Sequence, residues 1–446
     1  MDRMSIPIRK TIYLLAIMLV LLVCGCSTLR VARRQAPDTD YVQVDGQHFT
    51  LNGQPCHYVG VNYWYAPLLG MEGDPGDRTR LIRELDELQK LGLRNLRIIA
   101  ISEISSATGL VPAAQPAPGV YNEAWFRGLD FALSELDKRG MKAVLYVSNY
   151  WYWSGGMAQL VNWTTGEPIP PEKGDWQKRN AYITSFYQNP EAQALYYRAV
   201  DHLLNRVNTV SGRLYLEDPT IMSWQLCNEP RPGTYEQTVE TAPYMLQWVS
   251  EAADHFHKQG IHQLISIGSE GLFGVNGNEQ LYRDLHALDS IDYLTVHLWP
   301  QNWLWFDPKD GEGTIERTID ETRNYLDQHI AIARDLNKPM VLEEFGLARD
   351  GGGFTPDSSV VFRNRFLRLV GDVFEQDLAE GGPFAGINIW SWGGDAIPTE
   401  SAGRYWHQGD IFTGDNPIEP QGWYSIFKSD HESIRILSDL AKLAEE

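Results

Sequence analysis

Two glutamates lie at the ends of short apolar runs that are far apart in the sequence. Glu229 ends the run WQLCNE, and Glu344 lies in the run LEEFG. Two carboxyl groups can divide one reaction, because one gives a proton while the other attacks as a nucleophile. Hydrolysis of a glycosidic bond uses such a pair, with the two groups about 5–5.5 Å apart when the sugar configuration is retained. We therefore take Glu229 and Glu344 as the candidate catalytic residues.

The elements that must position these glutamates follow a repeating pattern. Short, nearly continuous apolar runs alternate with amphipathic stretches, and such runs are typical of parallel strands buried on both faces. The runs are residues 57–62, 95–100, 142–148, 221–227, 264–268, 293–297, 340–345 and 386–392; the main amphipathic stretches are 80–91, 124–138, 191–210, 244–258, 315–336 and 361–374. The pattern predicts an α/β fold, a single (β/α)8 TIM barrel, in which both glutamates fall at strand C-terminal ends, where barrel enzymes place their chemistry. A doubly wound open sheet is the alternative, but no Gly-rich phosphate loop follows the first run.

The remaining segments complete this barrel. Residues 41–54 alternate and contain Asp-Gly and Asn-Gly turns, so we expect an N-terminal β-hairpin that closes the bottom of the barrel. Long loops are expected at 149–188, 298–314 and 393–424. They hold nine of the 15 tryptophans: Trp151, Trp153, Trp163, Trp176, Trp299, Trp303, Trp305, Trp406 and Trp423. Aromatic rings on one face favour a sugar-binding cleft over plain core packing.

Composition and net charge indicate which kinds of partner this protein can bind. The 446 residues carry a formal net charge of −20, which repels nucleic acid, so we expect none as a partner. A neutral polysaccharide is not penalised by this charge. The helical pair His255 and His257 lacks metal-ligand spacing and there is no cysteine cluster, so we expect no metal and no cofactor. We expect a monomer.

The N-terminus is typical of a targeting segment. Arg9 and Lys10 precede an apolar stretch of about 13 residues, too short to span a membrane comfortably. The run VCGCS that follows is similar to a bacterial lipoprotein cleavage site, with Cys26 as the lipidated residue. An ordinary cleaved signal and an uncleaved anchor are the alternatives.

This interpretation divides the chain into three parts. Residues 1–25 are the signal peptide, 26–40 a flexible tether and 41–446 the catalytic domain. We expect an exported lipoprotein anchored in a bacterial cell envelope, on its periplasmic or cell-surface side, which touches the membrane only through the lipid. The other two cysteines, Cys56 and Cys227, fall at opposite ends of the barrel, too far apart to bridge, and are expected as buried free thiols.

Several motifs together resemble glycoside hydrolase family 5. They are Asn-Glu-Pro at 228–230, Glu-Phe-Gly at 344–346, Arg97 late in the second strand, His297 ending the sixth and Trp390 on the eighth. The resemblance spans essentially the whole chain after residue 41. It implies a retaining mechanism by double displacement, with Glu229 as acid/base and Glu344 as nucleophile.

The resemblance also implies roles for the surrounding residues. Asn228 would bind the sugar 2-hydroxyl, Arg97 would keep Glu344 ionised, and Trp390 would form the floor of the subsite. The reaction requires a raised pKa for Glu229 and a lowered pKa for Glu344. The family often has a tyrosine two residues after the strand-6 histidine, where this chain has Trp299, so a hydroxyl contact to Glu344 must come from elsewhere or be absent.

Glu343 is the alternative nucleophile. Successive residues of a strand point to opposite sides, so only one of the two adjacent glutamates should face the substrate. The family pattern selects the glutamate directly before the aromatic-glycine pair. We therefore expect Glu343 to accept a structural hydrogen bond instead.

The substrate is suggested by longer runs. NYWYAP at 62–67, WYWSGGM at 151–157, VNWTTGEP at 161–168 and VHLWPQNW at 296–303 resemble the β-1,4-mannanase branch of the family. This resemblance implies β-mannan or manno-oligosaccharides as substrate, with Trp64, Trp151, His297 and Trp299 among the binding residues. The long strand-8 loop could close the distal side of the site, and no binding module is present. We therefore favour an exo-acting β-mannosidase, with an endo-β-1,4-mannanase as the alternative and an endo-glucanase after it. A non-catalytic surface glycan-binding lipoprotein is less favoured, since both glutamates are present.

Overall fold

Eight parallel strands form the centre of the structure, a computed structural model. They are β4 (Tyr58–Asn62), β5 (Asn95–Ile99), β6 (Lys142–Tyr146), β7 (Ile221–Gln225), β8 (Leu264–Ser266), β9 (Leu294–Leu298), β10 (Met340–Phe345) and β11 (Phe384–Ile389). Strands β4 to β8 pair in sequence, as do β9 to β11, and β11 returns to pair with β4, as in the barrel that the sequence predicts. The seam between β8 and β9 is bridged by the Asp292 carboxylate, which accepts a hydrogen bond from the backbone N–H of Ile265 at 2.7 Å. The open-sheet alternative is excluded by the β11–β4 pairing.

The structure describes residues 40–104, 110–171 and 173–445. The expected signal peptide, the lipidation site Cys26 and nearly all of the tether lie outside these residues. Among the described helices, none is both long enough and apolar enough to cross a membrane.

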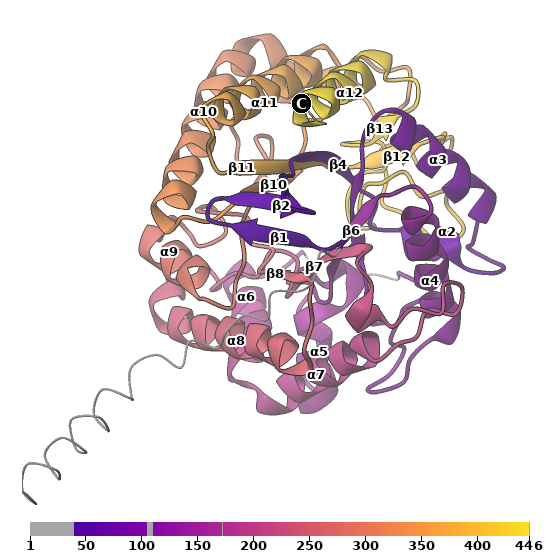
Figure 1. Cartoon of the computed structure of the whole chain (residues 1–446), viewed down its shortest axis with the longest axis vertical. Coiled ribbons are helices and arrows are strands. Elements are labelled where there is room, and N and C mark those ends of the chain that lie inside the picture. Colours follow the sequence, from indigo (N-terminus) through magenta and orange to yellow (C-terminus); the bar gives the residue numbers. More distant parts are fainter. Residues whose placement is uncertain (1–39, 105–109, 172, 446) are drawn as a thin grey trace, which may run out of the picture. The chain divides into compact units, whose positions relative to one another are not determined.

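Helices form a ring around the strands (Figure 1). They are α2 (Ala66–Gly70), α3 (Arg78–Lys90), α4 (Glu123–Asp137), α5 (Gly156–Thr165), α6 (Trp176–Thr184), α7 (Pro190–Leu204), α8 (Thr238–Gln259), α9 (Glu279–Ala287), α10 (Gly311–Leu336), α11 (Val361–Ala379) and α12 (His431–Glu445). Short 3-10 turns are η1 (Tyr152–Ser154), η2 (Ser185–Gln188), η3 (Tyr215–Glu217), η4 (Pro308–Asp310) and η5 (Asp350–Gly352). Side-chain caps start several helices; Asp77, for example, accepts from the backbone N–H of Arg80 in α3.

The segment 149–188 differs from the loop expected there. It folds into η1, α5, α6 and η2, and α5 buries Met157, Leu160 and Val161 in the core. Helices α9 and α12 were also not predicted. Both α5 and α9 are 10 residues or shorter, so they repeat the apolar pattern too few times to stand out in the sequence.

The bottom of the barrel is closed by the expected hairpin. Strands β1 (Val42–Asp45) and β2 (His48–Leu51) pair antiparallel, β3 (Gln54–Pro55) extends them, and β1 and β2 lie across the middle of the strands in Figure 1. Val42 and Phe49 pack on residues at the start of the barrel strands, among them Tyr58, Tyr293 and Val341. The hairpin therefore plugs the end of the barrel opposite to the strand C-termini.

The connection after β11 is long and held by side chains more than by regular structure. It contains only the short strands β12 (Trp392–Gly394) and β13 (Ile426–Phe427). The buried Asp415 carboxylate accepts from the backbone N–H groups of Gly422 and Tyr424 at 2.7 and 2.8 Å and from the hydroxyl of Ser425. We call residues 395–425 the strand-8 loop, because they follow β11, which is the eighth strand of the barrel.

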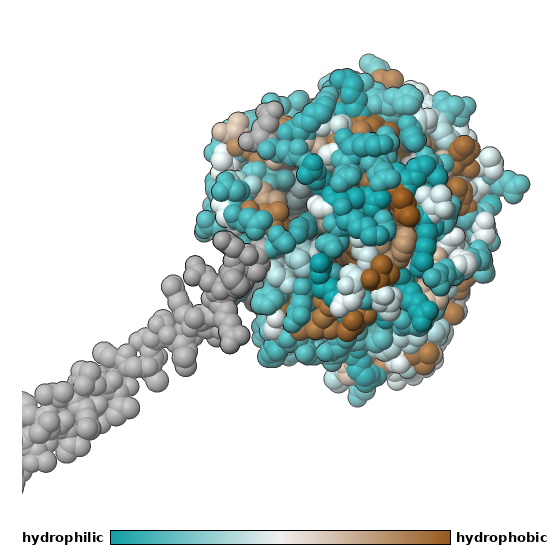
Figure 2. Space-filling view, turned by 45° about the vertical axis from the view of Figure 1, so that its right-hand side comes forward, coloured by the Kyte–Doolittle hydropathy of each residue, from teal (hydrophilic) through white to brown (hydrophobic). Residues whose placement is uncertain are grey.

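The described part of the chain contains two cysteines. Cys56 and Cys227 are both free thiols, as expected, but Cys56 is only half-buried because it lies at the rim of the bottom cluster. The face of the molecule in Figure 2 is mostly hydrophilic, and its apolar residues lie in small separate patches.

Candidate active site

Glu229 lies beyond the end of β7 in a strained backbone conformation. Its φ is +51°, a left-handed value that costs a non-glycine residue about 1–3 kcal/mol and is typical of functional sites. Hydrogen bonds to two neighbouring strand ends stabilise this conformation. The backbone N–H of Glu229 donates to the carbonyl oxygen of Gly268 at 2.8 Å, and that of Asn228 donates to the carbonyl oxygen of Ser148 at 2.8 Å. Only glycine fits at 268, since its φ is +86° and a Cβ would lie 2.0 Å from the carbonyl oxygen of Cys227.

Glu344 and Glu343 both contact groups inside the barrel, which strict strand alternation does not allow. The register of β10 against β9 shifts between Leu342 and Glu344, so a bulge turns both side chains inward. Glu344 lines the cavity described below, whereas Glu343 is buried and accepts from Gln225 Nε2 at 2.7 Å. Glu343 thus makes the structural hydrogen bond expected of it, but the reason is depth in the barrel rather than the opposite face.

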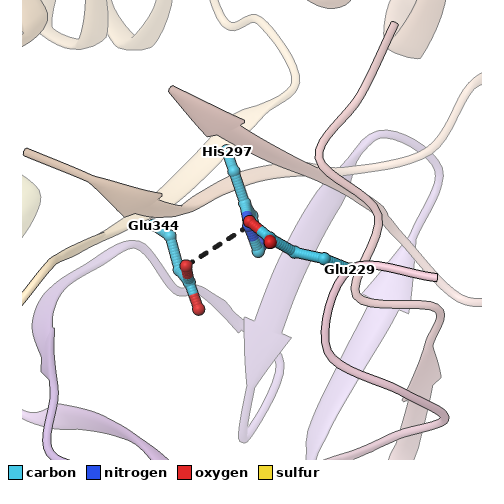
Figure 3. Close-up of side chains that lie close together, drawn as sticks. All are labelled: Glu229, His297 and Glu344. Carbon is cyan, nitrogen blue, oxygen red and sulfur yellow. Dashed lines mark hydrogen bonds and ion pairs between the residues drawn. The ribbon is translucent and has the colours of Figure 1, made fainter. Parts of the chain in front are cut away.

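Glu229, His297 and Glu344 converge at the centre of the site (Figure 3). One ligand-type atom of each lies within 4.8 Å of the others, so a carboxylate oxygen of Glu229 and one of Glu344 are no farther apart than that. His297 Nδ1 lies 2.5 Å from Glu229 Oε1 and 3.4 Å from Glu344 Oε2. In the described part of the chain these three side chains are also the one group with the spacing of metal ligands.

Arg97 on β5 ties the two halves of the site together. Its guanidinium contacts Glu344 Oε1, donates to Gln225 at 2.9 Å through Nε, and donates to Asn228 Oδ1 at 2.7 Å. Asn228 in turn donates to Asn149 at 3.1 Å. Arg97 is fully buried, so its charge acts on Glu344 with little screening.

Three ring N–H groups surround Glu229. His297 bonds to Oε1, Trp299 Nε1 donates to Oε1 at 3.2 Å, and Trp151 Nε1 donates to Oε2. For Glu344, no hydrogen bond from a hydroxyl group is found among residues 40–104, 110–171 and 173–445. Trp299 therefore serves Glu229 and does not supply the hydroxyl contact that a tyrosine could give to the nucleophile position.

In the free site, the pKa values of the two glutamates are shifted in directions opposite to those expected. Burial by itself raises the pKa of Glu229, but the hydrogen bond and charge of His297, with help from Arg231 and Trp151, lower that pKa to about 2. Burial raises the pKa of Glu344 to about 7, although His297 and Arg97 act against it. Burial lowers the pKa of His297, yet the carboxylates of Glu344 and Glu229 raise it to about 10. These shifts favour a protonated His297 and an ionised Glu229 in the free site.

A cavity of about 480 Å³ lies above this centre. It is lined mainly by aromatic and charged side chains from the loops after β6 to β11: Trp151, Tyr152, Trp153, Trp176, Arg179, Glu229, Arg231, Glu270, Phe273, Trp299, Asn302, Trp303, Glu344, Trp390, Asn416, Ile418, Glu419 and Trp423. Six of the nine loop tryptophans line it. A pocket walled by rings with a few charged groups suits a sugar, whose faces are apolar and whose edge carries hydroxyls.

The structure brings most of the predicted site residues together. Glu229, Glu344, Trp151, Trp299 and Trp390 line the cavity. Arg97, Asn228 and His297 lie beneath it and bond to the two glutamates or to each other. Trp390 follows β11 directly, and Gly346 makes room for it, since a Cβ there would lie 2.8 Å from the Trp390 carbonyl oxygen.

Trp64 is the exception and corrects the prediction made for it. It is 1% exposed, donates its indole N–H to Gly414 at 2.7 Å and packs edge-on against Trp153 at 5.2 Å. The strand-8 loop covers it, so Trp64 supports a cavity-lining ring and does not itself reach the cavity.

Several lining residues were missed by the sequence analysis. Arg231 and Glu270 form a two-point ion pair, with hydrogen bonds of 2.6 and 2.5 Å. Glu419 has one carboxylate oxygen without a partner in the described residues, and burial raises its pKa well above the usual value. Arg231 directly follows the Asn-Glu-Pro motif and Glu270 follows a strand end, so strand position was a usable signal for both. Glu419 lies deep in an irregular loop and offered none.

Comparisons with known proteins agree with this geometry. A family model described as GH family 5 beta-mannosidase-like matches residues 39–445. Mannan endo-1,4-beta-mannosidase 7 of Arabidopsis thaliana is 32% identical over 363 residues, which cover 78% of each chain. Mannan endo-1,4-beta-mannosidase 4 of Solanum lycopersicum is 31% identical over 373 residues, covering 80% of this chain and 84% of that one.

Solved structures are similar as well. The family 5 mannosidase from Rhizomucor miehei superposes with a TM-score of 0.84 at 31% identity, covering 92% of this chain and 99% of that one. The endo-1,4-beta-mannanase from the same organism has a TM-score of 0.67 at 21% identity, covering 91% and 100%, and supports the fold alone. The family match leaves no part of the barrel outside it, and the chain therefore belongs to the β-mannosidase-like members of glycoside hydrolase family 5, a family of glycosidases.

Proposed function

We propose that this enzyme is an exo-acting, retaining β-mannosidase that removes single mannose residues from manno-oligosaccharides and mannans. Hydrolysis of β-mannosidic bonds is the activity that the family and the names of the similar proteins share. A variant of the Rhizomucor miehei mannosidase has been solved with mannosyl-fructose, so a terminal mannoside fits a site of this kind. The observation that carries the proposal is a two-glutamate centre inside a cavity walled on one side by the strand-8 loop.

The spacing of the carboxylates supports retention of configuration. Inversion needs room for a water molecule between sugar and base, and its carboxyl groups lie about 6.5–9.5 Å apart. One oxygen of Glu229 lies within 4.8 Å of one oxygen of Glu344, which supports the shorter separation of a retaining enzyme. In the first half-reaction Glu344 forms a bond to the anomeric carbon while the bond to the leaving oxygen breaks and that oxygen takes the proton of Glu229. In the second, water attacks the anomeric carbon, gives its proton to Glu229 and releases Glu344.

The exo direction is supported by what the strand-8 loop covers. The segment after β4 could have opened one end of the cleft, but Gly414 and Phe412 pack over Trp64 and Tyr65. Accordingly the cavity is lined from the loops after β6 to β11, and its strand-8 side is formed by Asn416, Ile418, Glu419 and Trp423. A wall there supports exo action, because such action requires the sugars beyond the scissile bond to be limited.

The deciding experiment is the early product pattern from reducing-end-labelled mannohexaose. Mannose together with labelled mannopentaose, and no other early product, is the expected result. Mannobiose and mannotriose formed together from the start would instead show an open cleft and an endo-mannanase. Cleavage of a cello-oligosaccharide but not of mannohexaose would move the substrate to β-glucan.

A glycan-binding protein without catalysis remains a separate hypothesis. It predicts that the wild type and Glu344→Ala are equally inert on manno-oligosaccharides while both bind mannan. We expect the wild type to be active and the variant to lose that activity while it still binds.

We also propose export and lipid anchoring at Cys26, with a monomeric catalytic domain. The support is the basic start, apolar stretch and VCGCS run of the sequence. Labelled palmitate should enter the full-length chain in a bacterial host and should not enter Cys26→Ser. Sedimentation of the soluble domain should give the mass of one chain.

A further inference from the structure

Both carboxylate oxygens of Glu229 are occupied in the free site. Oε1 bonds to His297 and Trp299, and Oε2 accepts the indole N–H of Trp151. An N–H bond to a carboxylate stabilises its charged form and so opposes protonation. The first half-reaction nevertheless needs a proton on one of these oxygens, so one donor has to leave.

The three donors differ in how easily a sugar can displace them. His297 is fully buried and is held by a second contact, 3.2 Å from Nε2 to Glu343. Trp299 is 8% exposed and packs against Trp390 and Tyr424. Trp151 and Trp299 both line the cavity, but Trp151 is half-buried and thus the more exposed of the two. It is the donor that a bound sugar can push aside.

Trp151 is part of a column of rings and cations along the cavity wall. The Arg231 guanidinium lies 5.0 Å from its ring centroid, and Trp176 stacks on it at 6.1 Å and 30°. Arg179 lies 4.4 Å from the Trp176 ring. All four residues line the cavity, and Trp176 is 43% exposed. A sugar that occupies the cavity therefore meets the same column that ends at Glu229.

We propose that Trp151 is a positioning residue that keeps Glu229 ionised in the empty site and releases Oε2 when the leaving sugar fills the cavity. The bridging oxygen of the substrate then takes the place of the indole N–H, and a solvent proton binds Oε2. That proton passes to the bridging oxygen as the bond to the anomeric carbon breaks. The inference rests on the proposed function, since it takes Glu229 as the acid.

Other charged and titratable groups also face Glu229, and the test must leave them unchanged. They are His297 on β9, Glu344 on β10, Arg97 on β5, Tyr146 on β6, Cys227 and Arg231 on its own loop, Glu270 after β8, Tyr325 on α10 and Glu419 in the strand-8 loop. Trp151→Phe removes the N–H and part of the indole but keeps an aromatic ring in the column. Trp176→Phe, the next ring of the column, is the matched control.

The experiment follows protonation of Glu229 by its carboxylic C=O infrared band, which is assigned by its absence in Glu229→Gln. The band is titrated with and without a thio-linked mannobiose that is not hydrolysed. In the wild type and in Trp176→Phe we expect the ligand to raise the midpoint by about one pH unit or more. In Trp151→Phe the midpoint of the free enzyme should already be higher, so the rise on binding should be smaller. The pH dependence of kcat, which reports the complex, should be the same in Trp151→Phe and wild type.

Two outcomes overturn the inference. An equal rise in the wild type and Trp151→Phe would show that the sugar does not displace the indole. No rise in the wild type would do so even if the variant failed to fold. The proposed function is tested separately: if Glu229→Gln turned over mannobiose like the wild type, the acid assignment itself would fail, whatever the midpoints.

Discussion

The protonation states of three residues at the centre of this site depend on one another. Glu229, His297 and Glu344 lie within 4.8 Å of one another and are all buried, so the charge of each depends on the other two. The free site places a proton on His297 and leaves Glu229 ionised, which is the reverse of the order needed for the first half-reaction. Hydrogen bonds to Glu229 are therefore the part of the site that a substrate can use to change the order.

Glu229→Gln removes the proposed acid while keeping the size and most hydrogen bonds of the side chain. We expect kcat for mannobiose to fall about 10²–10⁴-fold. The loss in kcat/KM, which reports the first half-reaction, should be far smaller for 2,4-dinitrophenyl β-mannoside than for mannobiose, because its leaving group departs without a proton. Glu270→Gln, a second cavity-lining carboxyl, should affect the two substrates alike. A similar loss on both substrates for Glu229→Gln would contradict the acid role.

The pH dependence follows from the raised pKa of Glu344, about 7. The two glutamates together must hold one proton for turnover, and above this pH both are ionised. We expect kcat/KM for p-nitrophenyl β-mannoside to fall about tenfold per pH unit above about pH 7. Initial rates at low substrate concentration between about pH 4 and pH 9 would measure it. A fall that begins near the ordinary pKa of a glutamate would show that Glu344 is not the group that titrates.

At the scale of elements, the strand-8 loop decides the shape of the cavity. Asp415 organises it through backbone N–H groups and a hydroxyl, while Phe412 and Gly414 fasten it over the residues after β4. Regular secondary structure contributes little, since β12 and β13 are only three and two residues long. The wall on the strand-8 side therefore depends on a few buried polar contacts.

Asp415→Asn should loosen this wall, because one acceptor oxygen is replaced by a donor that faces other N–H donors. We expect KM for mannobiose to rise about tenfold, which corresponds to about 1.4 kcal/mol. Some mannobiose should also appear early from labelled mannohexaose. Asp410→Asn, which weakens the pair with Arg404 in the same loop, is the control and should keep the product pattern. Unchanged kinetics in Asp415→Asn would mean that the loop does not shape the site.

At the scale of the whole molecule, the barrel separates stability from chemistry. The hairpin plugs the end where the strands begin, and the cavity lies where they end. A buried parallel barrel tolerates loop changes at one end because packing at the other end is independent of them. Mutations in the plug should therefore change stability and leave the site alone.

Phe49→Ala tests this separation. Phe49 is fully buried, edge-on to Tyr293 at 5.3 Å, so its removal should lower the free energy of unfolding by about 3–5 kcal/mol. The limits of the pH profile for the folded enzyme should stay where they are in the wild type. Urea unfolding and kinetics at low temperature provide the two measurements. A shifted pH profile would show coupling between the two ends of the barrel.

The sequence by itself determined the barrel and the approximate ends of its strands. Apolar runs buried on both faces repeat strongly enough to be counted, and the hairpin is marked by its two glycine turns. The positions of Glu229 and Glu344 at strand ends followed from that pattern, since parallel strands carry their C-terminal ends to one face. Short helices such as α9 were missed because nine residues give too little periodicity.

Only the tertiary structure decided which residues meet. A bulge between Leu342 and Glu344 turned both glutamates inward, which alternation along a strand cannot show. Trp64 does not line the cavity, because a loop more than 300 residues away in the sequence folds over it. The contact between Trp151 and Glu229 likewise joins residues that lie 78 positions apart in the sequence. Distances through space, and the order of charges that depends on them, follow from packing between segments whose sequences carry no record of each other.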